Sequence, residues 1–381
     1  MEHLSIRHLG SINDIDIEFG DLTFFVGPQA SGKSLTLEAL KLIEDRDSII
    51  DTLDKYNYII GHNPQRILNI YFGEGLGKMW SDETYLELDG RRLTLKDIAN
   101  KSQNKESSIF YVPAQRIACM GDGYPKFFND FSFTTPYVLR DFSEILRTFV
   151  QLNIADAGKV FPIKSRFSNI QKEAFDKSIF HKGKITLSET AGQRKMFLDI
   201  DGLSIPFMAW STGQKEFMPL LLAFYCLAES PSKVAKKDKY STVIIEEPEM
   251  GLHPKAIESI LLQICELICE GYKVIVSTHS SLFIEFAWAF NTLKKNNESD
   301  IHAALCDLFK VKTTSSVGKM LGKFIENSIR TYFFSLSGET GSVSAKDISS
   351  RDDMSDEVDL SEWGGIMDFA TRTNDTVSKF S

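Results

Sequence analysis

Short hydrophobic runs of strand length recur along the chain. Three of them are residues 22–26, 243–247 and 274–277, and the second ends in two acids. Runs without polar alternation are typical of strands that are buried on both faces of a parallel sheet. Longer hydrophobic stretches of helical length adjoin them at residues 35–43, 216–227 and 255–270. Because helices of this kind cover the faces of a parallel sheet, the pattern predicts an α/β fold.

Other parts of the chain carry different patterns. Residues 3–19 alternate hydrophobic and polar positions around a Gly-Ser turn, which predicts an antiparallel hairpin. Residues 69–72 and 84–88 are rich in strand-forming side chains and predict two further strands. Residues 137–152 predict a helix within a Phe-rich region.

The turn after the first hydrophobic run carries a phosphate-binding motif. It reads Gly27, Pro28, Gln29, Ala30, Ser31, Gly32, Lys33 and Ser34, which fits the pattern G-x-x-x-x-G-K-[ST]. Gly27 and Gly32 allow the backbone to wrap a triphosphate so that its N–H groups point at the oxygens. Lys33 can then reach the β- and γ-phosphates, and the Ser34 hydroxyl can ligate Mg²⁺. We therefore expect ATP and Mg²⁺ to bind here.

Two later strands end in residues that suit ATP hydrolysis. The run 243–247 ends in Glu246 and Glu247, and in P-loop enzymes such a strand lies beside the loop. Glu246 is expected to hold the Mg²⁺ shell, and Glu247 to polarise the attacking water. The run 274–277 is followed by His279, which can contact the γ-phosphate or the water near it. A plain acidic turn is less favoured, because two carboxylates that end a buried strand need a cation or a polar cavity.

A third segment precedes the acidic strand and starts a helix. Ser211 suits an N-cap position, and Gly213 permits close approach of the backbone to an anion, although the segment also fits a plain helix start. At this place Ser211, Gly213 and Gln214 resemble the signature loop of the ABC-type ATPases. The resemblance implies that they complete the γ-phosphate site of a second subunit. Gln115, which follows another short hydrophobic run, matches the Q-loop of that family and is implied as a Mg²⁺ ligand.

The resemblance can be narrowed within the superfamily. Residues 246–254 read E-E-P-E-M-G-L-H-P, which is similar to RecF-like, SMC-like and overcoming-lysogenization-defect (OLD) ATPases. Transporter subunits usually carry Asp then Glu here, so that function is disfavoured. The resemblance covers residues 1–60, 108–118 and 205–290 well. It implies an ABC-type ATPase head with a flanking antiparallel β-subdomain, an inserted and mainly helical lobe, and dimerisation or higher assembly around ATP.

The positions of these motifs predict that the chain is divided into four parts. Residues 1–118 form the N-terminal part of the ATPase core, and residues 119–204 form the inserted lobe. Residues 205–330 complete the core with the signature loop, the acidic strand and the histidine strand. Residues 331–381 form an acidic extension, with nine acids against four bases between Lys346 and Ser381. Trp363, Ile366 and Phe369 recur there every three residues, so this extension either holds a partner or folds back on its own domain.

Charge is unevenly distributed over the chain. The formal net charge is −9, which argues against nonspecific coating of nucleic acid. Residues 160–195 are nevertheless basic, with eight Lys or Arg against three acids. This segment could grip phosphates or an acidic protein, or it could be an ordinary solvated surface. The candidate partner contacts are Lys164, Lys172, Lys177, Lys182 and Lys184.

Composition points to the cytoplasm. No hydrophobic run reaches the roughly 18 residues of a membrane span, and the N-terminus has no secretory pattern. The five cysteines are scattered and lack the paired spacing of a metal site, which favours reduced, buried thiols. We therefore expect no membrane association.

Two functions fit these residues. The first is an ATP-driven sensor or scaffold in anti-phage defence that controls a separate effector such as a nuclease. SMC-type heptads are absent, and the acids Asp352, Asp353, Asp356 and Glu357 lie in a polar stretch rather than after a strand, unlike a Toprim nuclease. The alternative is a RecF-like ATPase that binds DNA in repair or replication.

Overall fold

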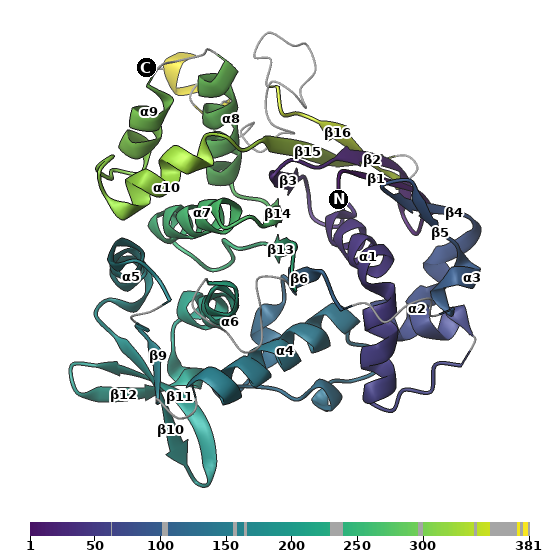
Figure 1. Ribbon diagram of the computed structural model, residues 1–381, viewed down its shortest axis with the longest axis horizontal. Coiled ribbons are helices and arrows are strands. Elements are labelled where there is room, and N and C mark those ends of the chain that lie inside the picture. Colours follow the sequence, from purple (N-terminus) through teal and green to yellow (C-terminus); the bar gives the residue numbers. More distant parts are fainter. Residues whose placement is uncertain are drawn as a thin grey trace.

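One large mixed sheet organises the molecule. The computed structural model (Figure 1) describes residues 1–61, 63–100, 106–154, 158–163, 166–228, 239–295, 300–338, 341–350, 372–373 and 376–379. The sheet has ten strands in the order β5-β4-β1-β2-β16-β15-β3-β14-β13-β6. Helices lie on both sides of it (Figure 1), which confirms the predicted α/β fold.

The parallel part of the sheet contains the hydrophobic runs. Its strands are β3 (Leu22–Val26), β14 (Lys273–Thr278), β13 (Thr242–Glu246), β6 (Ile109–Val112) and β15 (Ile329–Leu336). Each runs parallel to its neighbours in this part of the sheet. The carboxyl ends of parallel strands meet at one edge, which is where α/β proteins bind ligands.

Antiparallel strands extend the sheet on the other side. They are β1 (His3–Leu9), β2 (Ile12–Glu18), β4 (Trp80–Leu88) and β5 (Arg91–Leu93), and β16 (Val343–Asp347) joins them to β15. The hairpin predicted over residues 3–19 is confirmed as β1 and β2. The strand predicted over residues 84–88 is the second half of β4.

The prediction of a strand over residues 69–72 is wrong. These residues form the end of helix α2 (Pro64–Phe72). The Asn63 side chain caps this helix by accepting a hydrogen bond from the Arg66 N–H at 3.3 Å, and Pro64 occupies its first turn. A capped start six residues earlier therefore outweighs the local strand preference.

The two faces of the sheet are covered by different helices. On one side α4 (Tyr137–Phe149), α6 (Thr212–Leu227), α7 (Pro254–Cys269) and α8 (Ser281–Lys295) share a core with Phe24 and Val26 of β3. On the other side α1 (Lys33–Lys55) and α2 share a core with Phe25, which lies between Phe24 and Val26 in β3. Burial on both faces explains why these strands are continuously hydrophobic.

The segment predicted as a mainly helical lobe also holds a small sheet. Its order is β12-β11-β10-β9, from β9 (Lys159–Phe161), β10 (Lys184–Thr190), β11 (Gln193–Ile200) and β12 (Leu203–Pro206). Both hairpin turns have two successive residues at positive φ, Ala191-Gly192 and Asp201-Gly202. Such turns fit the twist of paired strands, so the Asp-Gly pair was a signal that the sequence analysis missed. The division of the chain into four parts stays a prediction.

Smaller elements complete the fold. The short helices are α3 (Leu95–Ile98), α5 (Asn169–Phe175), α9 (Ile301–Leu308) and α10 (Ser316–Phe324), and the two-residue strands are β7 (Met120–Gly121) and β8 (Tyr124–Pro125). Single turns of 3₁₀- or π-helix span Leu76–Met79, Arg116–Cys119, Phe128–Asp130, Val150–Ile154, Asp176–Phe180 and Phe207–Ala209. All five cysteines are free thiols. None of the helices among the described residues has the length and hydrophobicity to cross a membrane.

Candidate active site

The loop between β3 and α1 is shaped for an anion. Gly27 and Gly32 have φ values of 141° and 83°, and Ala30 between them has φ 60°. A Cβ at Gly27 would lie 2.2 Å from the Phe334 carbonyl oxygen of β15, so glycine is required by the packing beneath the loop. No side chain caps the start of α1, and its first turn holds no acid. The N–H groups at this helix end therefore remain available for a negatively charged ligand.

Lys33 lies across this loop. Its Nζ donates hydrogen bonds to the Gly27 and Pro28 carbonyl oxygens at 2.7 and 2.9 Å. Burial lowers the pKa of Lys33, while the charge of Glu247 acts in the opposite direction. The ammonium group is thus placed where the loop turns, next to the acids that follow β13.

Glu246 ends β13 inside the protein and is held on both oxygens. The Ser34 hydroxyl donates to its Oε2, and the Tyr111 hydroxyl donates to its Oε1 at 2.6 Å. Burial raises the pKa of Glu246, and the hydrogen bonds from Ser34 and Tyr111 oppose that shift. Sequence reasoning missed Tyr111, although it lies in the run directly before the Q-loop.

The three residues predicted to hold Mg²⁺ line one cavity. Ser34, Gln115 and Glu246 border a space of about 140 Å³, together with Glu38 from the second turn of α1. Their hydroxyl, amide and carboxylate oxygens are the donors that Mg²⁺ prefers, so the residues present fit this ion. Glu38 was also missed, and it lies one helical turn after Ser34 on the same helix face.

Glu247 and His279 meet at the ends of adjacent strands. His279 Nε2 lies 3.1 Å from Glu247 Oε1 and 3.4 Å from Lys33 Nζ. Burial, and then the nearby charge of Glu249, raises the pKa of Glu247 to about 8. Burial, and then the charge of Lys33, lowers the pKa of His279. Both directions favour the uncharged forms of the two groups.

Glu249 organises the turn after β14. Its Oε1 accepts hydrogen bonds from the Thr278 hydroxyl at 2.6 Å and from the N–H groups of His279 and Ser280 at 2.7 and 3.0 Å. Its Oε2 is buried without a hydrogen-bond partner among the described residues. The sequence analysis gave this acid no role, yet its contacts hold the backbone at His279.

The residues of the signature-like loop have contacts within the chain. Ser211 and Gln214 form a reciprocal capping box at the start of α6, and Gln214 Nε2 also donates to the Ile179 carbonyl at 3.1 Å. A Cβ at Gly213 would lie 2.6 Å from the Gly251 carbonyl oxygen. The need for glycine therefore has a structural cause besides anion binding. Among the described residues, no hydrogen bond joins this loop to the P-loop.

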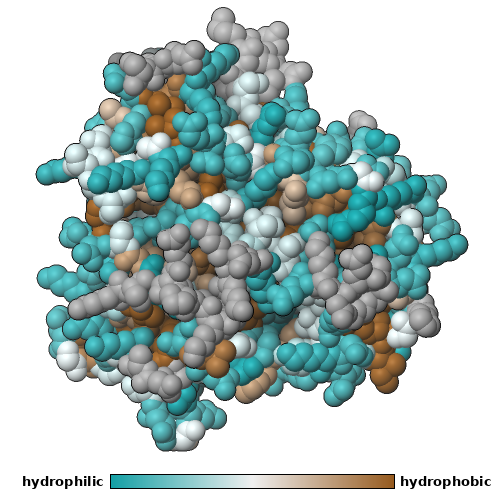
Figure 2. Space-filling view, in the orientation of Figure 1, coloured by the Kyte–Doolittle hydropathy of each residue, from teal (hydrophilic) through white to brown (hydrophobic). Residues whose placement is uncertain are grey.

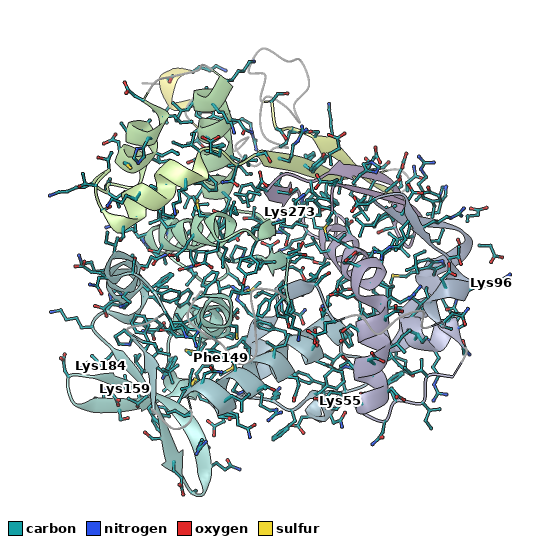
Figure 3. The ribbon with its side chains drawn as sticks, in the orientation of Figure 1. Lys55, Lys96, Phe149, Lys159, Lys184 and Lys273 are labelled. Atoms are coloured by element: carbon teal, nitrogen blue, oxygen red, sulfur yellow. The ribbon has the colours of Figure 1, made fainter. Side chains whose placement is uncertain are left out.

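The candidate partner contacts lie at the periphery. Lys184 is on the exposed side of the small sheet, near Lys159 (Figure 3), and the tip of the β10–β11 hairpin at the bottom of the molecule is hydrophilic (Figure 2). Lys182 is exposed, Lys177 pairs with Glu173 at 2.8 Å, and Lys172 donates to Asn169 Oδ1 at 3.2 Å. Lys164 lies outside the described residues.

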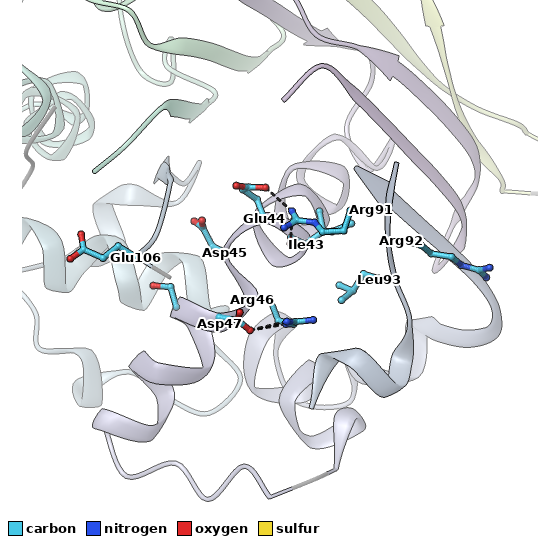
Figure 4. A pocket seen from close by; sticks show the side chains of 10 residues that line it. Ile43, Glu44, Asp45, Arg46, Asp47, Arg91, Arg92, Leu93 and Glu106 are labelled. Atoms are coloured by element: carbon cyan, nitrogen blue, oxygen red, sulfur yellow. Dashed lines mark hydrogen bonds and ion pairs between the residues drawn. The ribbon is translucent and has the colours of Figure 1, made fainter. Parts of the chain in front are cut away.

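A separate polar pocket of about 210 Å³ lies beside α1 and β5 (Figure 4). Arg91 pairs there with Glu44 at 2.7 Å, and Arg46 pairs with Asp47 at 2.9 Å. The arginine charges are therefore balanced by carboxylates. No residue of the P-loop lines this pocket.

Comparison with known proteins agrees with this geometry. A family model described as "AAA domain, putative AbiEii toxin, Type IV TA system" matches residues 122–285. The chain is also similar to the OLD nuclease of Thermus scotoductus, with 22% identity over 340 residues that cover 75% of this chain and 60% of that protein. The chain is therefore similar to this AAA-domain family and to an OLD nuclease. This agrees with the resemblance found in the sequence.

Other similar proteins align over shorter or more divergent stretches. The Old nuclease of Escherichia phage P2 is 30% identical over 123 residues, which cover 32% of this chain and 20% of that protein. The matches thus span about a fifth and three fifths of the two nucleases. Among solved structures, the SMC head domain from Thermotoga maritima has 13% identity and a TM-score of 0.40, covering 91% of this chain and 98% of that one. An SMC head bound to the C-winged helix domain of ScpA has 14% identity and a TM-score of 0.44, covering 92% and 97%.

Proposed function

We propose that this chain binds ATP with Mg²⁺ and hydrolyses it. The observation that carries the proposal is the meeting of three chain segments at one sheet edge. Lys33 from the P-loop lies 3.4 Å from His279 after β14, and His279 lies 3.1 Å from Glu247 after β13. A cation, a weak base and a carboxylate at this spacing suit a triphosphate and an attacking water.

Each residue has a distinct part in this proposal. The N–H groups of residues 27–34 bind the phosphate oxygens, and Lys33 contacts the β- and γ-phosphates. Ser34, Gln115 and Glu246 hold the metal, because their oxygens line the same cavity. When bound, Mg²⁺ supplies positive charge that offsets the charge developing on the phosphate oxygens.

Glu247 acts as the base for the attacking water, and His279 orients it. The raised pKa of Glu247, about 8, means that the carboxyl must lose its proton before it can accept one from water. Positive charge close to it favours the ionised form, and Lys33 already acts in this direction. We infer that bound Mg²⁺ acts in the same direction and offsets the negative charge of the phosphates.

Two copies of the chain assemble around ATP in this proposal. Ser211 is exposed at the start of α6, where helix N–H groups can receive a phosphate from another subunit. Ser211, Gly213 and Gln214 then act on the ATP of the partner copy. Their lack of hydrogen bonds to the P-loop within the described chain is compatible with this arrangement.

For the biological role we propose a sensor or scaffold whose ATP cycle controls a nuclease-type effector in anti-phage defence. The support is the similarity to two proteins named as OLD nucleases. We propose that the effector is a separate polypeptide. The alternative, a RecF-like DNA-binding ATPase, draws support from the exposed basic side chains of Lys182, Lys184 and Arg194.

Phosphate release and ATP affinity test the enzymatic proposal. Lys33→Ala is expected to lower the hydrolysis rate at least ~10²-fold, the scale of losing one transition-state donor. Lys55→Ala, an exposed lysine on the same helix, is the control and should hydrolyse ATP at the wild-type rate. Hydrolysis that is equal in all three proteins, or absent from the wild type, would refute the proposal.

A second experiment separates the biological roles. The tagged protein is purified from its host with ATP present, and co-purifying proteins are identified. The purified chain alone is then tested for nuclease activity and for salt-dependent binding of duplex DNA. A stoichiometric protein partner supports the separate effector. Intrinsic cleavage contradicts it, and tight DNA binding that weakens steeply with salt favours the RecF-like alternative.

A further inference from the structure

Arg116 is a buried arginine whose hydrogen bonds end on backbone carbonyls. Its side chain is 0% exposed. Nη1 donates to the carbonyl oxygens of Glu246 and Glu247 at 3.0 and 3.1 Å, and Nη2 donates to that of Glu247 at 3.1 Å. Nε donates to the Glu216 carbonyl at 3.1 Å. One guanidinium thus holds the turn that carries Glu246 and Glu247.

That turn has an unusual backbone. Glu247 has φ 43°, in the left-handed region of backbone conformation that residues other than glycine seldom occupy. Its N–H donates to the Ser277 carbonyl at 2.8 Å, and its carbonyl oxygen accepts from two nitrogens of Arg116. The Met250 N–H donates to the same carbonyl at 3.1 Å. Strained residues persist only where their surroundings hold them, and Arg116 is the side chain that contributes to that support here.

The same side chain joins three parts of the proposed site. Arg116 directly follows Gln115, which lines the cavity with Ser34 and Glu246. Glu216, another of its backbone partners, is on α6, about one turn after the signature-like residues Ser211 and Gly213. β6, β13 and α6 lie close together in this region (Figure 1).

We propose that Arg116 is a positioning residue for hydrolysis. By fixing the left-handed backbone of Glu247, it orients the carboxylate toward His279 and the attacking water. Its hydrogen bond to Glu216 couples this orientation to the position of α6. The proposal rests on the proposed ATPase function. It assigns Arg116 to the rate of hydrolysis rather than to the binding of ATP, since the guanidinium touches neither the P-loop nor Lys33 among its described contacts.

Arg140 provides a matched control elsewhere in the fold. It is also 0% exposed, and it donates to the Thr135 carbonyl at 2.9 and 2.6 Å and to the Ile70 carbonyl at 3.3 Å. It binds no residue of the P-loop or of the acidic turn. Arg140→Lys therefore reports what the loss of a buried guanidinium fork does to the fold alone.

The test compares Arg116→Lys with Arg140→Lys on the full chain. Lysine keeps the charge but loses the fork that bridges two carbonyls. For Arg116→Lys we expect kcat to fall about 10- to 100-fold, the cost of a small misplacement of a reacting group, with the ATP Kd changed less than about twofold. Arg140→Lys should keep the wild-type kcat and ATP Kd, while its Tm falls at least as much as that of Arg116→Lys. Rates are measured on the folded fraction, isolated by size exclusion and loaded with ATP.

Arg116→Gln is the second variant, because it retains a donor and removes the charge. It should show the same split between kcat and Kd. Equal losses of kcat and affinity, kcat values like those of Arg140→Lys, or failure of both Arg116 variants to give a folded fraction would overturn the proposal. A wild-type chain without hydrolysis would instead remove the proposed function beneath it.

Discussion

His279 Nε2 lies 3.1 Å from Glu247 Oε1, although the two residues end different strands and are 32 positions apart in the sequence. The pairing of β13 with β14 brings them together, since Glu246 stands opposite Ser277 in the register. Glu249 then holds the His279 N–H at 2.7 Å, so the imidazole is oriented from its own backbone. The candidate catalytic pair is therefore a product of strand register.

Glu247→Gln should retain ATP binding but lower hydrolysis by at least ~10²-fold, because the amide cannot accept a proton from water. It should also accumulate the ATP-bound assembly, measured by size exclusion with light scattering. Glu246→Gln should instead weaken Mg²⁺-dependent ATP binding, because a carboxylate oxygen of the metal cavity is lost. Equal and mild effects at both positions would show that the roles of the two acids are misassigned.

The rate of hydrolysis should depend on pH through Glu247. Its pKa is raised to about 8, and only the ionised carboxylate is a base, so kcat/KM should rise with pH up to about 8. The rise in kcat should follow the pKa of the same carboxyl in the ATP complex, where Mg²⁺ lowers that pKa and the phosphate charges raise it. A pH profile of both parameters, with Lys55→Ala as control, measures this. If kcat and kcat/KM both stayed constant between roughly pH 6 and 9, the assignment of Glu247 as the base would be contradicted.

The raised pKa of Glu247 also predicts that the stability of the nucleotide-free protein depends on pH. When the pKa of a carboxyl is higher in the folded state, its contribution to stability is complete at pH values below the pKa of the unfolded state. That contribution is lost as the pH rises through the pKa of the folded state. Between pH 4.5 and about 8 the wild type should therefore lose Tm relative to Glu247→Gln. Glu258→Gln, at an exposed position on α7, serves as control. A constant difference in Tm across this range would speak against a raised pKa.

Mixing two inactive variants tests the shared site. Lys33→Ala removes the P-loop lysine, and Ser211→Arg blocks the start of α6. If one copy supplies the P-loop and the other the signature-like loop, mixed dimers contain one intact site, and hydrolysis should be partly restored. The phosphate released by the mixture is compared with the sum of the separate proteins. A purely additive rate would show that the loop does not act on a partner.

Charge reversal tests the basic surface of the lobe. Changing Lys172, Lys177, Lys182 and Lys184 to Glu should abolish the biological activity, because surface charge there governs association. Basal hydrolysis should stay within about twofold, since the exposed Lys177–Glu173 pair contributes little to stability.

The matched control for this surface reverses four exposed lysines elsewhere, Lys78, Lys96, Lys310 and Lys312. It should leave both activities intact. Retained biological activity in the first variant would return its lysines to an ordinary solvated surface, whereas a collapse of hydrolysis would make the lobe part of the catalytic unit.

The sequence by itself determined the parts of the site that depend on local geometry. A phosphate loop needs Gly27 and Gly32 a fixed distance apart next to Lys33, and a buried strand that ends in two acids needs a polar destination. Both demands act within a few residues, so the pattern expresses them directly. The continuous hydrophobic runs likewise required strands covered on both faces, as the split of Phe24 and Phe25 between two cores shows.

Only the tertiary structure decided which distant side chains complete the site. Tyr111 binds Glu246 across 135 positions, and Arg116 reaches Glu247 across 131. Nothing in the local sequence specifies such partners, because they follow from strand order and register. The errors in the fold prediction have a different cause, since they concern local signals that were overlooked. The cap at Asn63 starts the helix that includes residues 69–72, and the small sheet of the lobe contains two tight hairpins with Ala-Gly and Asp-Gly turns.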